Sequence, residues 1–117
     1  TCVEHFMITE ETLKNWTGSL LENDRSIIGF YFLSTSPPDA ELERLYVAHQ
    51  LIGQGNGRRL FHIAAQTALD RNCRTIRIEA DVNAVPFYER MGAIQTGCYF
   101  PDIDARYKLA ELEYRLA

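Results

Sequence analysis

The sequence has no surplus of basic residues and no long apolar segment. Twelve Lys and Arg against 16 Asp and Glu give a formal net charge of −4 over 117 residues. Such a chain lacks the electrostatic footprint of a nucleic-acid binder and the polybasic patch of a membrane anchor. Its apolar runs are only a few residues long, too short to span a bilayer. We therefore expect neither nucleic acid nor a membrane among its partners.

Cysteine and histidine are scarce and widely spaced. The residues concerned are Cys2, Cys73, Cys98, His5, His49 and His62. They form no C-x-x-C pair and no cluster with zinc-site spacing, so we expect free buried thiols and no metal. The chain also lacks a basic-then-apolar leader at its start, and we expect a cytoplasmic protein.

Linkers, repeats and low-complexity segments are also lacking. The only segment rich in Pro or Ser, Ser34–Asp39, is short enough to be a loop. With 46% hydrophobic and 24% charged residues, the composition is that of an ordinary globular domain. We predict a single domain over residues 1–117. Because the chain begins with Thr1 and not Met, we expect this domain to be incomplete at its N-terminus.

Periodicity and turn signals predict an alternation of strands and helices. The expected helices are Thr9–Trp16, Gly55–Arg71 and a short helix capped by Asn83 that runs through Met91. The expected strands are Ile27–Ser34, Ala40–Val47, Thr75–Asp81, Ala93–Phe100 and Lys108–Leu116. Ile27–Ser34 is expected to pair with the segment before it through a turn at Asn23-Asp24.

The order of these elements defines the fold class. A strand, helix, strand succession implies a right-handed crossover that lays Ala40–Val47 and Thr75–Asp81 parallel. The remaining strands complete a mixed, mostly antiparallel sheet, so the class is α/β, or α+β by a stricter convention. Within Ala40–Val47, alternation places Leu42 and Tyr46 on one face. The opposite face then carries Glu41, Glu43, Leu45 and Val47.

A glycine-rich loop, Gly53-Gln54-Gly55-Asn56-Gly57, lies between a predicted strand and a predicted helix. Backbone N–H groups and the positive end of the helix dipole converge at such a turn, which suits phosphate. The Walker pattern fails, because Arg58 and Arg59 follow the last glycine. The dinucleotide pattern G-x-G-x-x-G fails as well, because its third glycine would fall on Arg58 or Leu60. The loop could also be a plain turn without a ligand.

Two ordered segments resemble the GCN5-related N-acetyltransferase (GNAT) superfamily. LYVAHQLIGQGNGRRLF, from Leu45 to Phe61, is similar to the family's fourth strand, pyrophosphate loop and long helix. ADVNAVPFYERMGA, from Ala80 to Ala93, is similar to the end of its fifth strand and the following helix. The hairpin before them and the strands after them extend the resemblance over most of the chain. It implies the family's fold. Family members usually begin with a strand and one or two helices, and of these we expect only the last helix, around Thr9–Trp16, to be present.

The resemblance implies acetyl-CoA as co-substrate, held between two splayed parallel strands. Its pyrophosphate would lie on the loop amides, and its pantetheine arm would pair with the strand backbone near Tyr46 and Val47. A backbone N–H there would polarise the thioester carbonyl. The implied cofactor-binding residues are Tyr46, Val47, Ile52, Gly53, Gln54, Gly55, Asn56, Gly57, Arg58, Asn83 and Phe87.

The resemblance also implies catalytic residues. Tyr88 occupies the family position whose phenol points at the CoA sulfur and protonates the leaving thiolate. Acetylation needs a neutral amine, so a carboxylate that takes up a proton would help. Glu41 and Glu43 rank first for this role, and Glu79 and Asp81 remain alternatives. The acceptor would be an amine of a small molecule or a peptide, and the resemblance also allows a homodimer.

One residue departs from the family pattern. The loop is often Q/R-x-x-G-x-G/A, and alignment on Gly55 and Gly57 puts Ile52 where Gln or Arg is usual. The phosphate contact there is mainly through the backbone, so binding is not excluded. A catalytically idle domain that binds CoA or a protein partner remains the alternative to an acetyltransferase.

Overall fold

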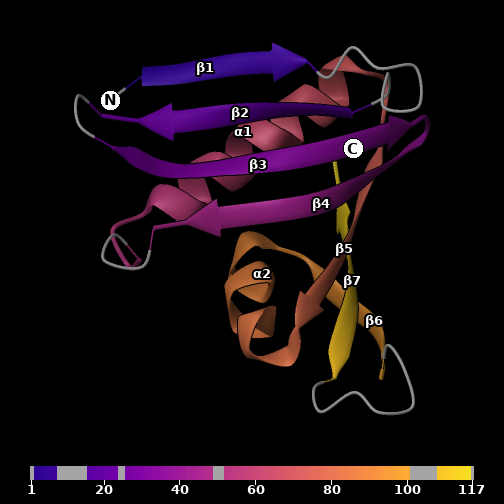
Figure 1. The fold of residues 1–117 in the computed structure, drawn as a ribbon. Helices are drawn as coiled ribbons and strands as arrows, with labels where there is room; N and C mark the ends of the chain where they lie inside the picture. The colour runs from indigo at the N-terminus through magenta and orange to yellow at the C-terminus, as the bar shows by residue number, and fades with distance from the viewer. Residues whose placement is uncertain (1, 8–15, 24–25, 49–51, 101–107, 117) are drawn as a thin grey trace.

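The structure, a computed structural model, describes residues 2–7, 16–23, 26–48, 52–100 and 108–116. Within these ranges the chain forms a seven-stranded sheet with the order β1-β2-β3-β4-β5-β7-β6 (Figure 1). All neighbouring strands are antiparallel except β4 and β5, which are parallel. The strands are β1 (Cys2–Met7), β2 (Trp16–Glu22), β3 (Ile27–Ser36), β4 (Asp39–Val47), β5 (Thr75–Asp81), β6 (Ile94–Tyr99) and β7 (Leu109–Arg115). The predicted mixed sheet with one parallel pair is confirmed.

The long helix α1 (Asn56–Asp70) packs across one face of the sheet and lies behind β2 and β3 in Figure 1. Its buried face consists of Leu60, Phe61, Ala64 and Ala68, a spacing that forms one apolar stripe of a helix. Asn72, just beyond the helix, has the left-handed φ of 69°. The predicted helix is therefore confirmed, with its ends displaced by one residue.

The parallel strands β4 and β5 are paired only along their first halves. Residues 39–42 pair with residues 75–78, from Asp39–Thr75 to Leu42–Ile78. Beyond that point β4 continues along β3, while β5 continues along β7. The two strands consequently diverge, as Figure 1 shows. We call the gap between residues 43–47 and residues 79–81 the fork.

A second, short helix covers the open side of the fork. The 3-10 turn η3 (Val82–Ala84) and helix α2 (Val85–Met91) follow β5, and Gly92 ends α2 with a φ of 111°. The rings of Phe61 in α1 and Tyr88 in α2 lie 6.1 Å apart, so both helices lie on the same face of the sheet. We call the face without a described helix the outer face.

A chain of buried hydroxyl groups connects α1 to two strands. The Ser19 hydroxyl donates to the Tyr31 hydroxyl at 3.2 Å, and the Tyr31 and Thr67 hydroxyl oxygens are 2.9 Å apart. Thr67 donates its own proton to the Ile63 carbonyl at 2.9 Å. Tyr31 must therefore be the donor to Thr67, and the chain runs in one direction from β2 to α1.

The alternation predicted within β4 is wrong beyond the middle of the strand. An extra residue, Glu43, has no partner in the pairing with β3. One extra residue in a strand reverses the face on which the later side chains lie. Leu45 and Val47 accordingly pack against the core with Leu42, whereas Tyr46 is 46% exposed on the outer face.

The N-terminal part differs from the prediction in two places. Residues Cys2–Met7 form strand β1, although we expected the initial strand to be missing, and β1 pairs with β2. Trp16 begins β2 and does not end a helix, because it pairs with Ser34 and its ring lies 6.5 Å from that of Phe32. Such long-range contacts override a local helical spacing. The rest of the predicted first helix lies outside the described residues.

Two other expectations change in detail. The Asp81 carboxylate accepts a hydrogen bond of 2.8 Å from the Asn83 N–H, so Asp81 and not Asn83 caps the turn after β5. Cys73 and Cys98 are free thiols, but Cys98 lies exposed on β6 while Cys73 is buried. An edge strand with one face toward solvent explains the exposure of Cys98, which the spacing of the cysteines does not reveal.

Candidate active site

The fork exposes unpaired backbone groups of β4. The Ala48 N–H donates to the Ile28 carbonyl at 2.8 Å. Residues with backbone bonds to the partner alternate along an antiparallel pair, so the backbone of Tyr46 also faces β3. The N–H and C=O groups of Leu45 and Val47 then face the fork. By register, the backbone groups open to pairing at the fork are those of Leu45 and Val47, and those of Tyr46 are not.

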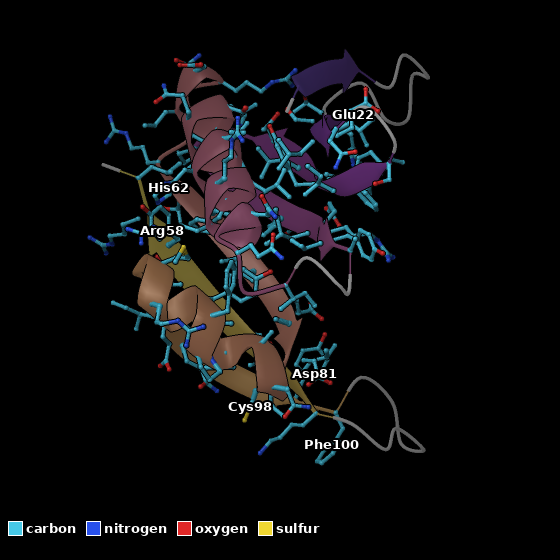
Figure 2. All side chains as sticks on the ribbon, turned by 90° about the vertical axis from the view of Figure 1, so that its left-hand side faces the viewer. Glu22, Arg58, His62, Asp81, Cys98 and Phe100 are labelled. Carbon is cyan, nitrogen blue, oxygen red and sulfur yellow. The ribbon has the colours of Figure 1, made fainter. Side chains whose placement is uncertain are left out.

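The glycine loop brings the N-terminus of α1 to the fork. Gly53 and Gly55 have left-handed φ values of 89° and 84°, which residues with a side chain rarely adopt. Gly55 is the N-cap, and no described side chain caps the helix. The amides of the first turn consequently have no intrahelical partner. In Figure 2, Arg58 lies at the end of α1 that faces α2, so it adds a positive charge beside these free amides.

A cavity of about 960 Å³, here called the helix-face cavity, lies between β4, the glycine loop and α2. The predicted residues that line it are Tyr46, Val47, Ile52, Gly53, Gly55, Gly57, Arg58, Asn83, Phe87 and Tyr88. Leu45, Asp81 and Arg90 line it as well, although the sequence did not point to them for cofactor binding. Gln54 and Asn56 belong to the loop but do not line the cavity. The structure thus brings most of the predicted binding residues together.

Two glycines allow the elements around this cavity to approach closely. A Cβ on Gly57 would lie 3.1 Å from a ring carbon of Phe87, so α1 meets α2 at this point. A Cβ on Gly29 of β3 would collide with the Tyr46 carbonyl and would lie 2.8 Å from Leu60. Gly29 therefore fixes the end of β4 against the start of α1. Nothing in its apolar strand segment marks it, because only the packed helix makes a side chain impossible there.

Tyr88 lines the helix-face cavity from α2. It is 7% exposed, and the rings of Phe61 and Phe87 lie 6.1 and 5.0 Å from its own. Burial disfavours the charged form and raises the pKa of Tyr88 to about 12. The phenol is therefore protonated throughout the neutral range and can donate a hydrogen bond or a proton.

A second cavity of about 600 Å³, here called the outer-face cavity, lies on the other side of the same strands. Glu41 and Glu43, both predicted as bases, line it together with Glu79. Glu43 accepts a 2.6 Å hydrogen bond from the Ser34 hydroxyl, and Glu79 accepts one from the Tyr99 hydroxyl. Glu43 is the first β4 residue beyond the last β4–β5 pair, which places it at the fork.

Comparison with known proteins identifies the family. The model of the acetyltransferase (GNAT) domain family matches residues 3–100. This match covers most of the chain, and the protein belongs to the GNAT acetyltransferase domain family. The resemblance seen in the two sequence segments is thereby confirmed.

Solved structures show the same fold. An IAA acetyltransferase from Bacillus cereus ATCC 14579 superimposes with a TM-score of 0.82 at 17% identity, over 97% of this chain and 98% of that one. The ribosomal-protein-S18-alanine N-acetyltransferase from Escherichia coli gives 0.77 at 18%, over 89% and 71%. A candidate streptothricin acetyltransferase from Bacillus anthracis str. Ames, solved in complex with acetyl coenzyme A, gives 0.77 at 25%, over 86% and 62%.

The described residues contain neither a helix suited to cross a membrane nor a group of side chains suited to hold a metal ion. None of the helices in these ranges is both long and apolar enough to cross a membrane. Among the same residues, no three His, Cys, Asp or Glu side chains are grouped so that they could hold a metal ion.

Proposed function

We propose that this protein is an acetyl-CoA-dependent N-acetyltransferase that transfers an acetyl group to a primary amine by direct attack on the thioester. The observation that carries the proposal is the meeting, at one fork, of the uncapped α1 N-terminus, the unpaired β4 backbone and Tyr88. The acetyl coenzyme A bound to the Bacillus anthracis relative supports the choice of co-substrate.

The lining of the helix-face cavity suits each part of acetyl-CoA. The loop amides and Arg58 would bind the pyrophosphate, since both supply positive charge at a helix N-terminus. The backbone groups of Leu45 and Val47 would pair with the pantetheine amides, in the manner of an added strand. Asn83 and Phe87 would close the cavity on the α2 side. The co-substrate supplies an acetyl carbon activated by its bond to sulfur.

The chain's own groups then serve the transfer. The amine nitrogen bonds to the acetyl carbon, the carbon–sulfur bond breaks, and one amine proton moves to a carboxylate. A backbone N–H of Leu45 or Val47 donates to the oxygen on which negative charge develops. Tyr88 donates to the leaving sulfur. Its pKa of about 12 lies above the roughly 8.5 of an ordinary thiol, so a hydrogen bond is favoured over complete proton transfer.

A carboxylate at the fork would take up the proton that the acceptor amine must lose before it can attack. An alkyl amine with a pKa of about 10.4 is about one part in a thousand neutral at pH 7.4, a cost of roughly 4 kcal/mol. We assign the base to Glu43, which is at the fork, with Glu41, two residues earlier on β4, as the second candidate. The substitution Glu43→Gln tests this role: it should lower kcat strongly and leave the KM for acetyl-CoA unchanged, while Glu41→Gln should leave kcat nearly unchanged.

Release of free thiol from acetyl-CoA with a panel of amines tests the proposed activity. Melting curves test binding separately: a ligand of the folded state stabilises it by about 2.7 kcal/mol at a hundredfold excess over its dissociation constant. Acetyl-CoA should raise the melting temperature, and NADH and ATP much less. Equal shifts from all three, or thiol release with no amine, would contradict the proposal.

The exposed Ile52 favours a second candidate, an idle domain that binds CoA or a protein partner. Ile52 is 63% exposed at the rim of the cavity, where the family pattern usually has Gln or Arg. Such a domain would melt at a higher temperature with acetyl-CoA but release no thiol. For either function, the free thiols of Cys73 and Cys98 support a reducing compartment, and we propose the cytoplasm.

A further inference from the structure

Four aromatic side chains form a continuous row across the outer face. Trp16, Phe32, Phe30 and Tyr46 come from three neighbouring strands, β2, β3 and β4. The ring centroids of successive members lie 6.5, 5.5 and 5.3 Å apart in that order. These distances are those of interacting aromatic pairs. We call this set the aromatic row.

The strand register places the aromatic row on the face opposite the two helices. Phe30 and Phe32 alternate along β3 with Tyr31 and Leu33, whose side chains are fully buried in the core. Because successive side chains of a strand point to opposite faces, the two Phe rings lie on the outer face. Tyr46 of β4 lies directly opposite Phe30 and therefore shares this face.

Tyr46 ends the aromatic row at the fork. Strand β5 pairs with β4 only as far as Leu42 and Ile78, so β5 does not adjoin β4 beside Tyr46. The Tyr46 ring is stacked on Phe30 at an interplanar angle of 29°, and it is still 46% exposed. Tyr46 also lines the helix-face cavity. The open end of the row therefore adjoins the place at which we propose that the acetyl group is transferred.

The charges beside this end of the row do not favour a ligand of one sign. Glu43 and Arg44 are consecutive, exposed residues of β4, and Arg44 lies directly opposite Phe32. A carboxylate and a guanidinium on adjacent residues leave little net charge for an acceptor to neutralise. Aromatic surface is therefore the feature that distinguishes this side of the fork. Apolar and aromatic side chains beside a few polar groups are the usual lining of a small-molecule site.

We infer that the acceptor is a primary amine with an aromatic ring on a short alkyl chain, an inference that rests on the proposed N-acetyltransferase activity. The acceptor ring stacks on Tyr46 and continues the aromatic row over the fork. Its amine then lies near Glu43, because three residues of a strand span roughly 10 Å. The ammonium gives a proton to Glu43, and the neutral nitrogen bonds to the acetyl carbon. The carbon–sulfur bond breaks with its electron pair on sulfur, and a second proton passes from nitrogen to the thiolate.

A matched series of acceptors tests the inference. Thiol release from acetyl-CoA is measured with ethylamine, 2-cyclohexylethylamine and 2-phenylethylamine, and kcat/KM is expressed per neutral amine because the three differ in basicity. The phenyl compound should give at least about a tenfold higher kcat/KM than ethylamine, since burial of the ring adds to stacking. The cyclohexyl compound, which is apolar but not aromatic, should lie between them. A phenyl compound no better than either of the other two would overturn the inference.

Tyr46 provides the matching variants. Tyr46→Leu keeps an apolar side chain but removes the ring, so it should lower the ratio of kcat/KM for 2-phenylethylamine over ethylamine by at least about threefold. This ratio cancels any effect of the substitution on acetyl-CoA, because both reactions use the same co-substrate. Tyr46→Phe is the control, because it keeps the ring and should retain the ratio. A melting curve of each variant verifies folding, and an unchanged ratio in folded Tyr46→Leu would overturn the assignment.

The results separate this inference from the proposed activity. If acetyl-CoA binds and ethylamine reacts as fast as 2-phenylethylamine, the activity stands and the acceptor class is wrong. If no amine of a broad panel releases thiol, the proposed activity itself fails, and the inference fails with it.

Discussion

The two cavities at the fork lie on opposite faces of the same strands, but different parts of the chain build them. Backbone amides, glycines and aromatic rings form the helix-face cavity. Charged side chains on three strands form most of the outer-face cavity. A site made of backbone keeps its ligand as surface side chains change, whereas a site made of charges changes its ligand with a few substitutions. If the protein is the acetyltransferase that we propose, substitution of surface side chains should affect its co-substrate site less than the outer-face cavity.

The largest effect should come from a negative charge in the backbone-built cavity. Asp and Asn have the same shape and both tolerate the left-handed φ of 84° at Gly55, so Gly55→Asp and Gly55→Asn differ only in charge. Like charges about 4 Å apart repel by about 1 kcal/mol in water and about 4 kcal/mol near a protein surface. We expect Gly55→Asp to bind acetyl-CoA at least about a hundredfold more weakly than Gly55→Asn, measured by calorimetry. Equal affinities would mean that the loop binds no phosphate.

The next effect concerns the one side chain on the helix face to which we assign chemistry. Tyr88→Phe keeps the ring packed against Phe61 and Phe87 and removes the hydroxyl. The loss of a hydrogen bond to a charged group, about 1.5–3 kcal/mol, predicts a fall in kcat of roughly tenfold to a hundredfold. The KM for acetyl-CoA should hardly change. Single-turnover acetyl transfer at the wild-type rate would remove Tyr88 from the chemistry.

Tyr88 should also make the stability of the protein depend on pH in the alkaline range. Burial raises the pKa of Tyr88 from 10.0 to about 12, so between these values the folded chain keeps a proton that the unfolded chain loses. Stability falls with rising pH when the folded state binds more protons. The melting temperature of the wild type should therefore fall more steeply between pH 10 and pH 12 than that of Tyr88→Phe. Parallel curves would contradict a buried phenol.

The smallest expected effect is a gain in stability on the outer face. Glu79 and Glu111 are directly paired, so removal of one of these like charges by Glu111→Gln should raise the free energy of unfolding by roughly 0.2–1 kcal/mol. The hydrogen bond from the Thr96 hydroxyl to the Glu111 backbone carbonyl is unaffected by this change. Denaturant unfolding measures the gain, with Glu22→Gln as the control. A loss of stability would mean that Glu111 has a structural partner.

Local patterns predicted the helix, the strand and the glycine loop around the helix-face cavity. Helix α1 and strand β5 follow from periodicity and turn residues within a few positions of the chain, and the glycine loop joins β4 to this helix. The resemblance added Tyr88 and Phe87, and packing brings both residues to the same cavity. What local patterns could not predict here is Leu45, because the backbone groups that face the fork depend on the pairing with β3.

The outer-face cavity depends on strand partners that the sequence does not specify. Glu79 and Glu111 are 32 positions apart and become neighbours only because β7 inserts between β5 and β6. The bulge at Glu43 arises in the same way, from the register with β3. Gly29 is a third case, since a helix packed from elsewhere in the chain leaves it no room for a side chain.

The one-way chain of hydroxyl groups from Ser19 through Tyr31 to Thr67 has a mechanical consequence. A helix tied to two strands by hydrogen bonds of fixed direction resists rotation about its axis, because any turn of α1 breaks the Tyr31–Thr67 bond. Helix α2 is about half as long, at seven residues against 15, and no such bonds among the described residues tie it to the sheet. When a bulky ligand enters the helix-face cavity, α1 should therefore keep its position relative to the sheet, and α2 should move to make room.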